Sequence, residues 1–129
     1  MAEFRERRTM LRVALSDNHT VRTHDGVEAR LIDLSVRGAH VEHLGILRPG
    51  SLCILELPPE LGSLLLPAQI VWCTILGAEW RVDGERHLRA QSGLWFNKMT
   101  ESQRTVLASI LQQLSVGDQA SFDSHKGSA

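Results

Sequence analysis

Three arginines lie close together near the N-terminus: Arg7, Arg8 and Arg12. A guanidinium group is permanently charged and presents a planar fork of donors that binds phosphate oxygens in pairs. The same fork matches the O6 and N7 acceptors of guanine, and its flat face can stack on an aromatic ring. The arginines therefore favour an anionic ligand that carries phosphate or guanine. The alternative is a solvated arm with no ligand.

A second group of residues, Asp33, Ser35 and Gly38, has chemistry that complements the first. A carboxylate such as that of Asp33 accepts hydrogen bonds from the ring N–H and exocyclic amine of guanine. If residues 27–35 form a strand, Asp33 and Ser35 point to the same face. Gly38 suits either a turn with positive φ or a close backbone approach. The alternative is a turn in which the polar side chains only cap their own backbone.

Length and composition limit the possible classes of protein. A chain of 129 residues is large enough for one domain with a core. The formal net charge of −1, with only the N-terminal stretch clearly basic, argues against general binding to a nucleic-acid polymer. Cys53 and Cys73 lie in apolar runs without metal-ligand spacing, which predicts reduced core residues and a cytoplasmic setting. We expect no association with a membrane, because no apolar run reaches spanning length and no signal peptide is recognisable.

Short apolar segments separated by turn residues predict an all-β domain. The Asp25-Gly26 pair predicts a hairpin, and the polar segment 77–92 predicts a second hairpin that turns near Asp83-Gly84. Pro67 is expected at the start, edge or bulge of a strand, because it cannot donate to a sheet ladder. The predicted strands cover residues 20–23, 27–32, 39–44, 52–57, 68–75 and 93–96.

One C-terminal helix follows the strands. Thr100 and Gln103 have the spacing of a capping box, and apolar residues recur at helical intervals as far as Leu114. We expect this helix to cover an opening of the β-structure and to stop near Gly117. A helix that binds a partner is the alternative. The small and polar residues 116–129 predict a disordered tail.

Catalytic and metal-binding patterns are weak. His40 and His43 are three residues apart in a predicted strand, so they face opposite sides and cannot chelate one ion. Ser35 lacks the G-x-S-x-G setting of a nucleophile, and no G-x-x-x-x-G-K motif exists for a nucleoside triphosphate. We expect a protein that is not an enzyme and has no metal or cofactor.

The order of the two residue groups resembles the PilZ family. Arg8 and Arg12 match its R-x-x-x-R element, and Asp33, Ser35 and Gly38 match its [D/N]-x-S-x-x-G element. The resemblance covers residues 4–115. It implies an antiparallel Greek-key β-barrel of six to seven strands with one C-terminal α-helix. It also implies binding of the bacterial second messenger cyclic di-GMP.

The resemblance further implies a role for each matching residue. Phosphates and guanines would be bound by Arg7, Arg8 and Arg12, over a rigid floor formed by Asp33, Ser35 and Gly38. In this family the position of Arg7 is associated with the number of ligand molecules, so an intercalated dimer of cyclic di-GMP is expected. Residues 1–12 would form a flexible arm on a barrel-and-helix domain of residues 13–115. The arm would fold over the ligand and create a surface for a protein partner.

Three tryptophans are interpreted with the resemblance in mind. Trp72 lies in the strand that the resemblance places beside the binding surface, so it either stacks on the ligand or packs in the core. Trp80 and Trp95 are interpreted as packing residues. The segment 77–92 is longer than the connection usual in the family, which leaves the local strand count open.

The sequence therefore predicts a cyclic di-GMP receptor that couples the second messenger to a protein partner in motility, exopolysaccharide or virulence control. The alternative within the family is an interaction adaptor that does not bind cyclic di-GMP. A third possibility, from another class, is a barrel that binds RNA or DNA and whose affinity for polyanions collapses with salt.

Overall fold

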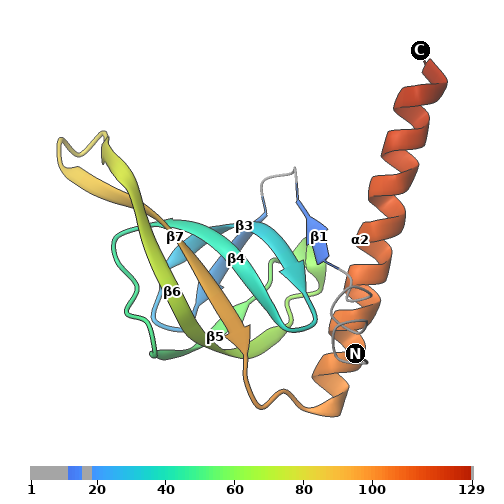
Figure 1. Ribbon diagram of the computed structural model, residues 1–129, viewed down its shortest axis with the longest axis horizontal. Helices are drawn as coiled ribbons and strands as arrows, with labels where there is room; N and C mark the ends of the chain where they lie inside the picture. Colours follow the sequence, from blue (N-terminus) through green and yellow to red (C-terminus); the bar gives the residue numbers. More distant parts are fainter. Residues whose placement is uncertain (1–11, 16–18, 129) are drawn as a thin grey trace, which may run out of the picture.

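The computed structural model describes the backbone of residues 12–15 and 19–128, and the side chains as far as residue 115. Within these residues the chain forms β-strands, one short 3-10 helix and one α-helix (Figure 1). The elements are β1 (Arg12–Ala14), β2 (Thr20–Thr23), β3 (Glu28–Ser35), β4 (Gly38–Leu44), β5 (Leu52–Glu56), η1 (Pro59–Leu61), β6 (Leu65–Trp80), β7 (Arg86–Phe96) and α2 (Glu101–Ser128).

The strands form one antiparallel sheet in the order β1-β3-β2-β5-β6-β7-β4. Because β3 also pairs with β4, the sheet closes into a barrel. β1 and β2 pair with different parts of β3, near residues 33–35 and 28–30 respectively. This seven-stranded barrel with one C-terminal helix confirms the predicted fold class.

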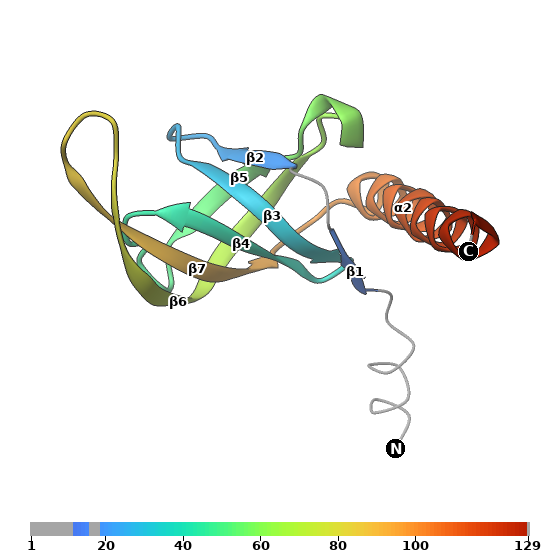
Figure 2. The same cartoon turned by 90° about the horizontal axis from the view of Figure 1, so that it is seen from above.

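Alternating side chains fill the barrel, and burial of their apolar surface stabilises the fold. In β5, for example, Cys53 and Leu55 point inward, while their neighbours are exposed. The first half of α2 adds Leu107, Ile110 and Leu111 to the same core, so the helix lies against the barrel (Figure 2). Burial raises the pKa of the Cys53 thiol, because the low-polarity interior disfavours the thiolate.

Two hairpin predictions are confirmed by backbone hydrogen bonds. At the turn between β2 and β3, the Gly26 amide donates to the Thr23 carbonyl over 2.9 Å, and Gly26 has a φ of 93°. At the turn between β6 and β7, Arg81 and Glu85 are joined by a backbone bond of 3.1 Å. The second hairpin extends beyond the barrel (Figure 1).

The capping box of α2 is also confirmed. The Gln103 amide donates to Thr100 Oγ1 over 3.0 Å, and the Thr100 amide donates to Gln103 Oε1 over 2.8 Å. The predicted stop near Gly117 is wrong, since α2 continues to Ser128. A glycine inside a helix costs only about 1 kcal/mol relative to alanine, which is too little by itself to end the helix. The division of the chain into an N-terminal arm of residues 1–12, a domain of residues 13–115 and a tail of residues 116–129 stays a prediction.

Strand β6 is longer than predicted, and two packing assignments are wrong. β6 begins at Leu65 because its first residues pair with β5, and Pro67 is its third residue, opposite Ile54. Trp80 and Trp95 are 73% and 63% exposed. Trp80 lies on the hairpin beyond the barrel, and Trp95 takes the outer side of β7 beside the inward Leu94.

No helix within the described part of the chain has the length and apolar character needed to cross a membrane.

Candidate functional site

Four residues form one row across neighbouring strands of the barrel. Asp33 of β3 lies opposite His40 of β4, and His40 lies opposite Gly93 of β7. Gly93 in turn lies opposite Trp72 of β6. The row borders a shallow pocket of about 110 Å³.

Five residues predicted from the sequence line this pocket: Arg12, Asp33, Ser35, Gly38 and Trp72. They come from β1, β3, β4 and β6, so pairing between distant segments brings them together. Arg7 and Arg8, the remaining predicted ligand-binding residues, lie outside the described residues.

A β-bulge in β3 sets the direction of Asp33. The pairing of β3 with β4 shifts register between Leu31 and Asp33. Leu31 and Leu34 are both fully buried although they are three residues apart, which regular alternation does not allow. The extra residue at this point turns Asp33 toward the outer surface, as bulges beside functional sites commonly do.

A second bulge, in β6, sets the direction of Trp72. The pairing of β6 with β7 shifts register between Ile70 and Trp72. Ile70 is 4% exposed and Trp72 is 40% exposed, although residues two apart share a face in a regular strand. The bulge therefore moves the indole from the core to the pocket.

Gly93 makes room for the indole. A Cβ atom built on Gly93 would overlap the indole nitrogen of Trp72. The indole lies over this glycine and meets the His40 ring edge to face, with 5.2 Å between ring centroids and 62° between planes. Gly93 and His40 were missed by the sequence reasoning. A glycine inside a predicted strand, however, is a signal for such a close approach.

The Asp33 carboxylate faces a side-chain nitrogen on each side. Oδ1 lies 3.5 Å from Nη1 of Arg12, and Oδ2 lies 3.4 Å from Nδ1 of His40. His40 is held in turn by Gln91, with 3.1 Å between Nε2 and Oε1. The Arg12 side chain is exposed, whereas the His40 and Asp33 side chains are partly buried.

Ser35 and Gly38 shape the floor of the pocket. Ser35 lines the same pocket as Asp33, but its buried hydroxyl accepts hydrogen bonds from the amides of Arg37 and Gly38, at 3.2 and 3.3 Å. It therefore fixes the turn between β3 and β4. A Cβ atom on Gly38 would overlap the Leu94 carbonyl oxygen. Close approach, rather than positive φ, thus explains this glycine.

His40 and His43 face opposite sides of β4, as predicted. His43 is buried, and its Nε2 lies 2.7 Å from the Ser92 hydroxyl. Burial lowers the pKa of His43 because the low-polarity interior disfavours the charged ring. Of the two histidines, only His40 contributes to the pocket.

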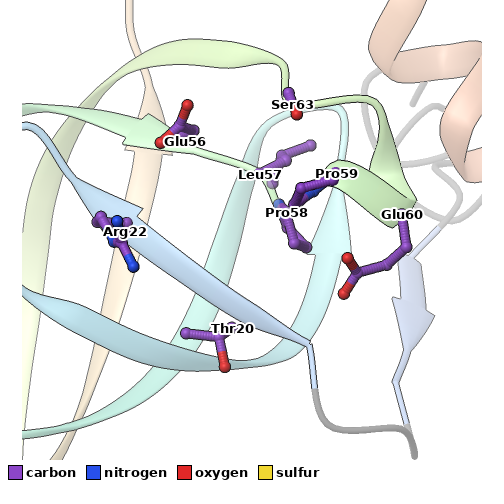
Figure 3. Close-up of a pocket in the computed structure, with 8 residues that line it drawn as sticks. All are labelled: Thr20, Arg22, Glu56, Leu57, Pro58, Pro59, Glu60 and Ser63. Atoms are coloured by element: carbon purple, nitrogen blue, oxygen red, sulfur yellow. The ribbon is translucent and has the colours of Figure 1, made fainter.

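Two larger pockets lie elsewhere on the barrel. One of about 410 Å³ lies between β2 and the segment that follows β5, with Arg22, Glu56 and Glu60 on its walls (Figure 3). Its Arg22 is paired with Glu28 at 2.9 Å.

The other, of about 820 Å³, is lined by Arg30, Arg89 and Glu42 among others, and Glu42 pairs with both arginines. These arginines are paired with glutamates, as Arg12 is paired with Asp33 in the smaller pocket. The smaller pocket is the better candidate site because Trp72 and residues of both sequence motifs line it.

The fold and the pocket define a small antiparallel β-barrel with a polar and aromatic site on its outer surface. The PilZ domain model matches residues 3–113, most of the chain, so this protein belongs to the PilZ domain family. A search of curated proteins found no match.

Solved structures of other proteins share this fold. The PilZ domain of YcgR from Escherichia coli, with c-di-GMP, has a TM-score of 0.70 and 18% identity, over 91% of this chain and 98% of that chain. The K. pneumonia MrkH–c-di-GMP complex has a TM-score of 0.66 and 16% identity, over 88% of this chain and 54% of that chain. At these identities the likeness establishes the fold. The chain spans about half of MrkH and half of the longer YcgR structure, which it covers by 50%.

Proposed function

We propose that this PilZ domain is a cyclic di-GMP receptor without catalytic activity. The observation that carries the proposal is the convergence of Arg12, Asp33 and Trp72 on one pocket. These three side chains offer a phosphate-binding cation, an acceptor for the guanine edge and an aromatic surface. Solved relatives described as complexes with c-di-GMP support the same ligand.

Each residue has a distinct part in the proposed complex. Asp33 accepts hydrogen bonds from the ring N–H and amine of one guanine, and Trp72 offers its indole for stacking. Arg12 and Arg8 bind phosphate oxygens or the opposite guanine edge. Ser35 keeps the floor rigid through the turn bonds described above, and Gly38 lets the strands approach.

The size of the pocket gives the N-terminal arm its role. A volume of about 110 Å³ is below the roughly 300–1,000 Å³ of typical ligand pockets. Much of a cyclic dinucleotide would therefore lie outside the pocket, against the arm that carries Arg7 and Arg8. We propose that ligand neutralises these crowded cations and orders the segment before β1, which carries Arg7 and Arg8, over itself. A protein partner in the cytoplasm would recognise the ordered surface.

Calorimetric titration of the purified chain tests the receptor proposal. Cyclic di-GMP is expected to bind, with linear dinucleotide and GMP binding far more weakly. Affinity for the cyclic ligand should change only modestly with salt. Broad affinity for polyanions that collapses with salt would instead support a nucleic-acid-binding barrel.

Ligand stoichiometry is a separate part of the proposal and depends on Arg7. Two stacked ligands double the phosphate charge, so a further guanidinium is needed to neutralise it and to stack on an exposed guanine. We expect two ligand molecules per wild-type domain and one in Arg7→Leu, measured by calorimetry at ligand concentrations well above the dissociation constant. One ligand in both proteins would refute the proposed dimer.

An adaptor that does not bind cyclic di-GMP is the second candidate. It is favoured by exposed apolar side chains on the outer face of the barrel, of which Leu52, Leu65 and Trp95 are more than half exposed. It is also favoured by the paired state of Asp33, whose two oxygens already face Arg12 and His40. An adaptor would show no heat of binding with the dinucleotide and would bind its partner equally with and without it.

A further inference from the structure

His40 lies between Asp33 and Gly93 in the row, and it contacts Asp33, Trp72 and Gln91, a residue of β7 beside the row. Nδ1 lies 3.4 Å from Oδ2 of Asp33, and Nε2 lies 3.1 Å from Oε1 of Gln91. The ring centroid lies 5.2 Å from that of Trp72. His40 is thus the side chain that connects Asp33, the proposed guanine acceptor, with Trp72, the proposed stacking surface.

Gln91 fixes the orientation of the His40 ring. Nε2 of the ring lies 3.1 Å from the side-chain amide of Gln91, which holds that edge of the imidazole against β7. The opposite edge then places Nδ1 beside the Asp33 carboxylate, 3.4 Å from Oδ2. Gln91 therefore keeps the imidazole in contact with Asp33.

We propose that His40 is a positioning residue that gives the site its selectivity for guanine. This inference rests on the proposed function. With His40 in place, Oδ2 of Asp33 has a fixed partner even when Arg12 leaves Oδ1 to bind a phosphate. The carboxylate then keeps one orientation beside the indole. Without His40 it turns freely, and the donors on the guanine edge lose a pre-organised acceptor.

Calorimetry on the full chain tests this role with cyclic di-GMP and cyclic di-AMP as ligands. His40→Leu removes both ring nitrogens at similar size and is expected to weaken cyclic di-GMP binding about five- to tenfold. Cyclic di-AMP should lose much less, because adenine lacks the ring N–H. His40→Asn should restore most of the affinity, since its amide nitrogen lies near the place of Nδ1. The matched control is His87→Leu, because His87 also pairs with an aspartate, Asp83, at 3.2 Å.

A double-mutant cycle separates positioning from general stability. In an Asp33→Ala background, His40→Leu should cause no further loss, because its effect passes through the carboxylate. Additive losses, or equal losses for both cyclic dinucleotides, would overturn the inference. Undiminished cyclic di-GMP binding by His40→Leu would overturn it while leaving the receptor proposal intact. Failure of the wild-type chain to bind would overturn both.

Discussion

Two regions of the protein contain the same kinds of residue in different surroundings. The candidate site has Trp72, the pair Asp33 and His40, and Gly93. The β6–β7 hairpin also has a tryptophan, an aspartate–histidine pair and a glycine, namely Trp80, Asp83, His87 and Gly84. The distances between histidine nitrogen and aspartate oxygen are alike, 3.4 Å in the site and 3.2 Å in the hairpin.

The surroundings make the two regions different. The Asp33 side chain is 18% exposed and the Asp83 side chain is 53% exposed. Asp83 serves its own turn, since its Oδ1 accepts from the Glu85 amide at 2.8 Å. In the site, side chains from β1, β3, β4, β6 and β7 meet, and each restricts the next. Residue types alone therefore do not make a site; long-range pairing and partial burial hold them in one arrangement.

The largest effect is expected from Gly38, where a side chain would meet backbone. Gly38→Ala should lower the free energy of unfolding by about 2 to 3 kcal/mol, because the Leu94 carbonyl cannot move without separating two strands. Urea denaturation measures the change. Gly77→Ala in β6 is the control, since a Cβ there meets nothing within 4 Å, and we expect a change below about 0.5 kcal/mol. Equal effects at both glycines would contradict the close-approach explanation.

The next effect concerns Arg8 and Arg12, with Arg81 of the β6–β7 hairpin as the control. Arg12→Ala is expected to abolish measurable cyclic di-GMP binding, because it removes charge-assisted hydrogen bonds worth about 1.5 to 3 kcal/mol. The fold should remain intact, since the Arg12 side chain is exposed. Arg8→Ala should behave in the same way. Arg81→Ala in the β6–β7 hairpin should bind cyclic di-GMP like the wild type. Calorimetry measures the binding, and circular dichroism melts measure whether the fold is intact. Binding that survives in Arg8→Ala and Arg12→Ala would exclude these two residues from the site.

A smaller effect should distinguish the two tryptophans. Trp72→Leu is expected to weaken cyclic di-GMP binding about tenfold, because stacking of one base is worth roughly 1 to 3 kcal/mol. Trp80→Leu should leave the affinity unchanged, because Trp80 is the last residue of β6 and does not line the pocket. Titration calorimetry gives both affinities. If Trp72→Leu binds as tightly as Trp80→Leu, Trp72 is only a packing residue.

The smallest effect is a pH dependence of the free energy of unfolding, which should differ between His43 in the barrel interior and Asp83 in the β6–β7 hairpin. The pKa of His43 is lowered from 6.5 by burial, so the unfolded chain takes up a proton before the folded chain does as pH falls. The stability contributed by neutral His43 is therefore present above pH 6.5 and is lost as pH falls through the lowered pKa. Urea denaturation from pH 7 to pH 5 should show this decline, and His43→Gln should flatten it.

Asp83 provides the control for this measurement. Hydrogen bonds from the Glu85 amide and from His87 lower the pKa of Asp83 from 3.8. Its contribution is lost only as pH falls below that value, so Asp83→Asn should leave the slope between pH 7 and pH 5 unchanged. An unchanged slope in His43→Gln would show that other groups cause the decline.

Local features of the molecule were predictable from the sequence. The turn at Asp25-Gly26 and the capping box of Thr100 and Gln103 each depend on residues within a few positions of one another. The hairpin at Gly84, where φ is 82°, is of the same kind. The backbone preferences and side-chain hydrogen bonds that cause these features are written in short stretches of sequence.

The arrangement of the site depended on tertiary structure. His40 and Gln91 are separated by 51 positions, and the row that joins Asp33 to Trp72 exists only because β3, β4, β7 and β6 are neighbours. Bulges before Asp33 and Trp72 reverse the faces that strict alternation assigns. A bulge follows from how distant strands fit together, which no short stretch of sequence encodes. The sequence by itself therefore determined the residue types, the turns and the helix cap, whereas the packing of the closed barrel decided which side chains meet.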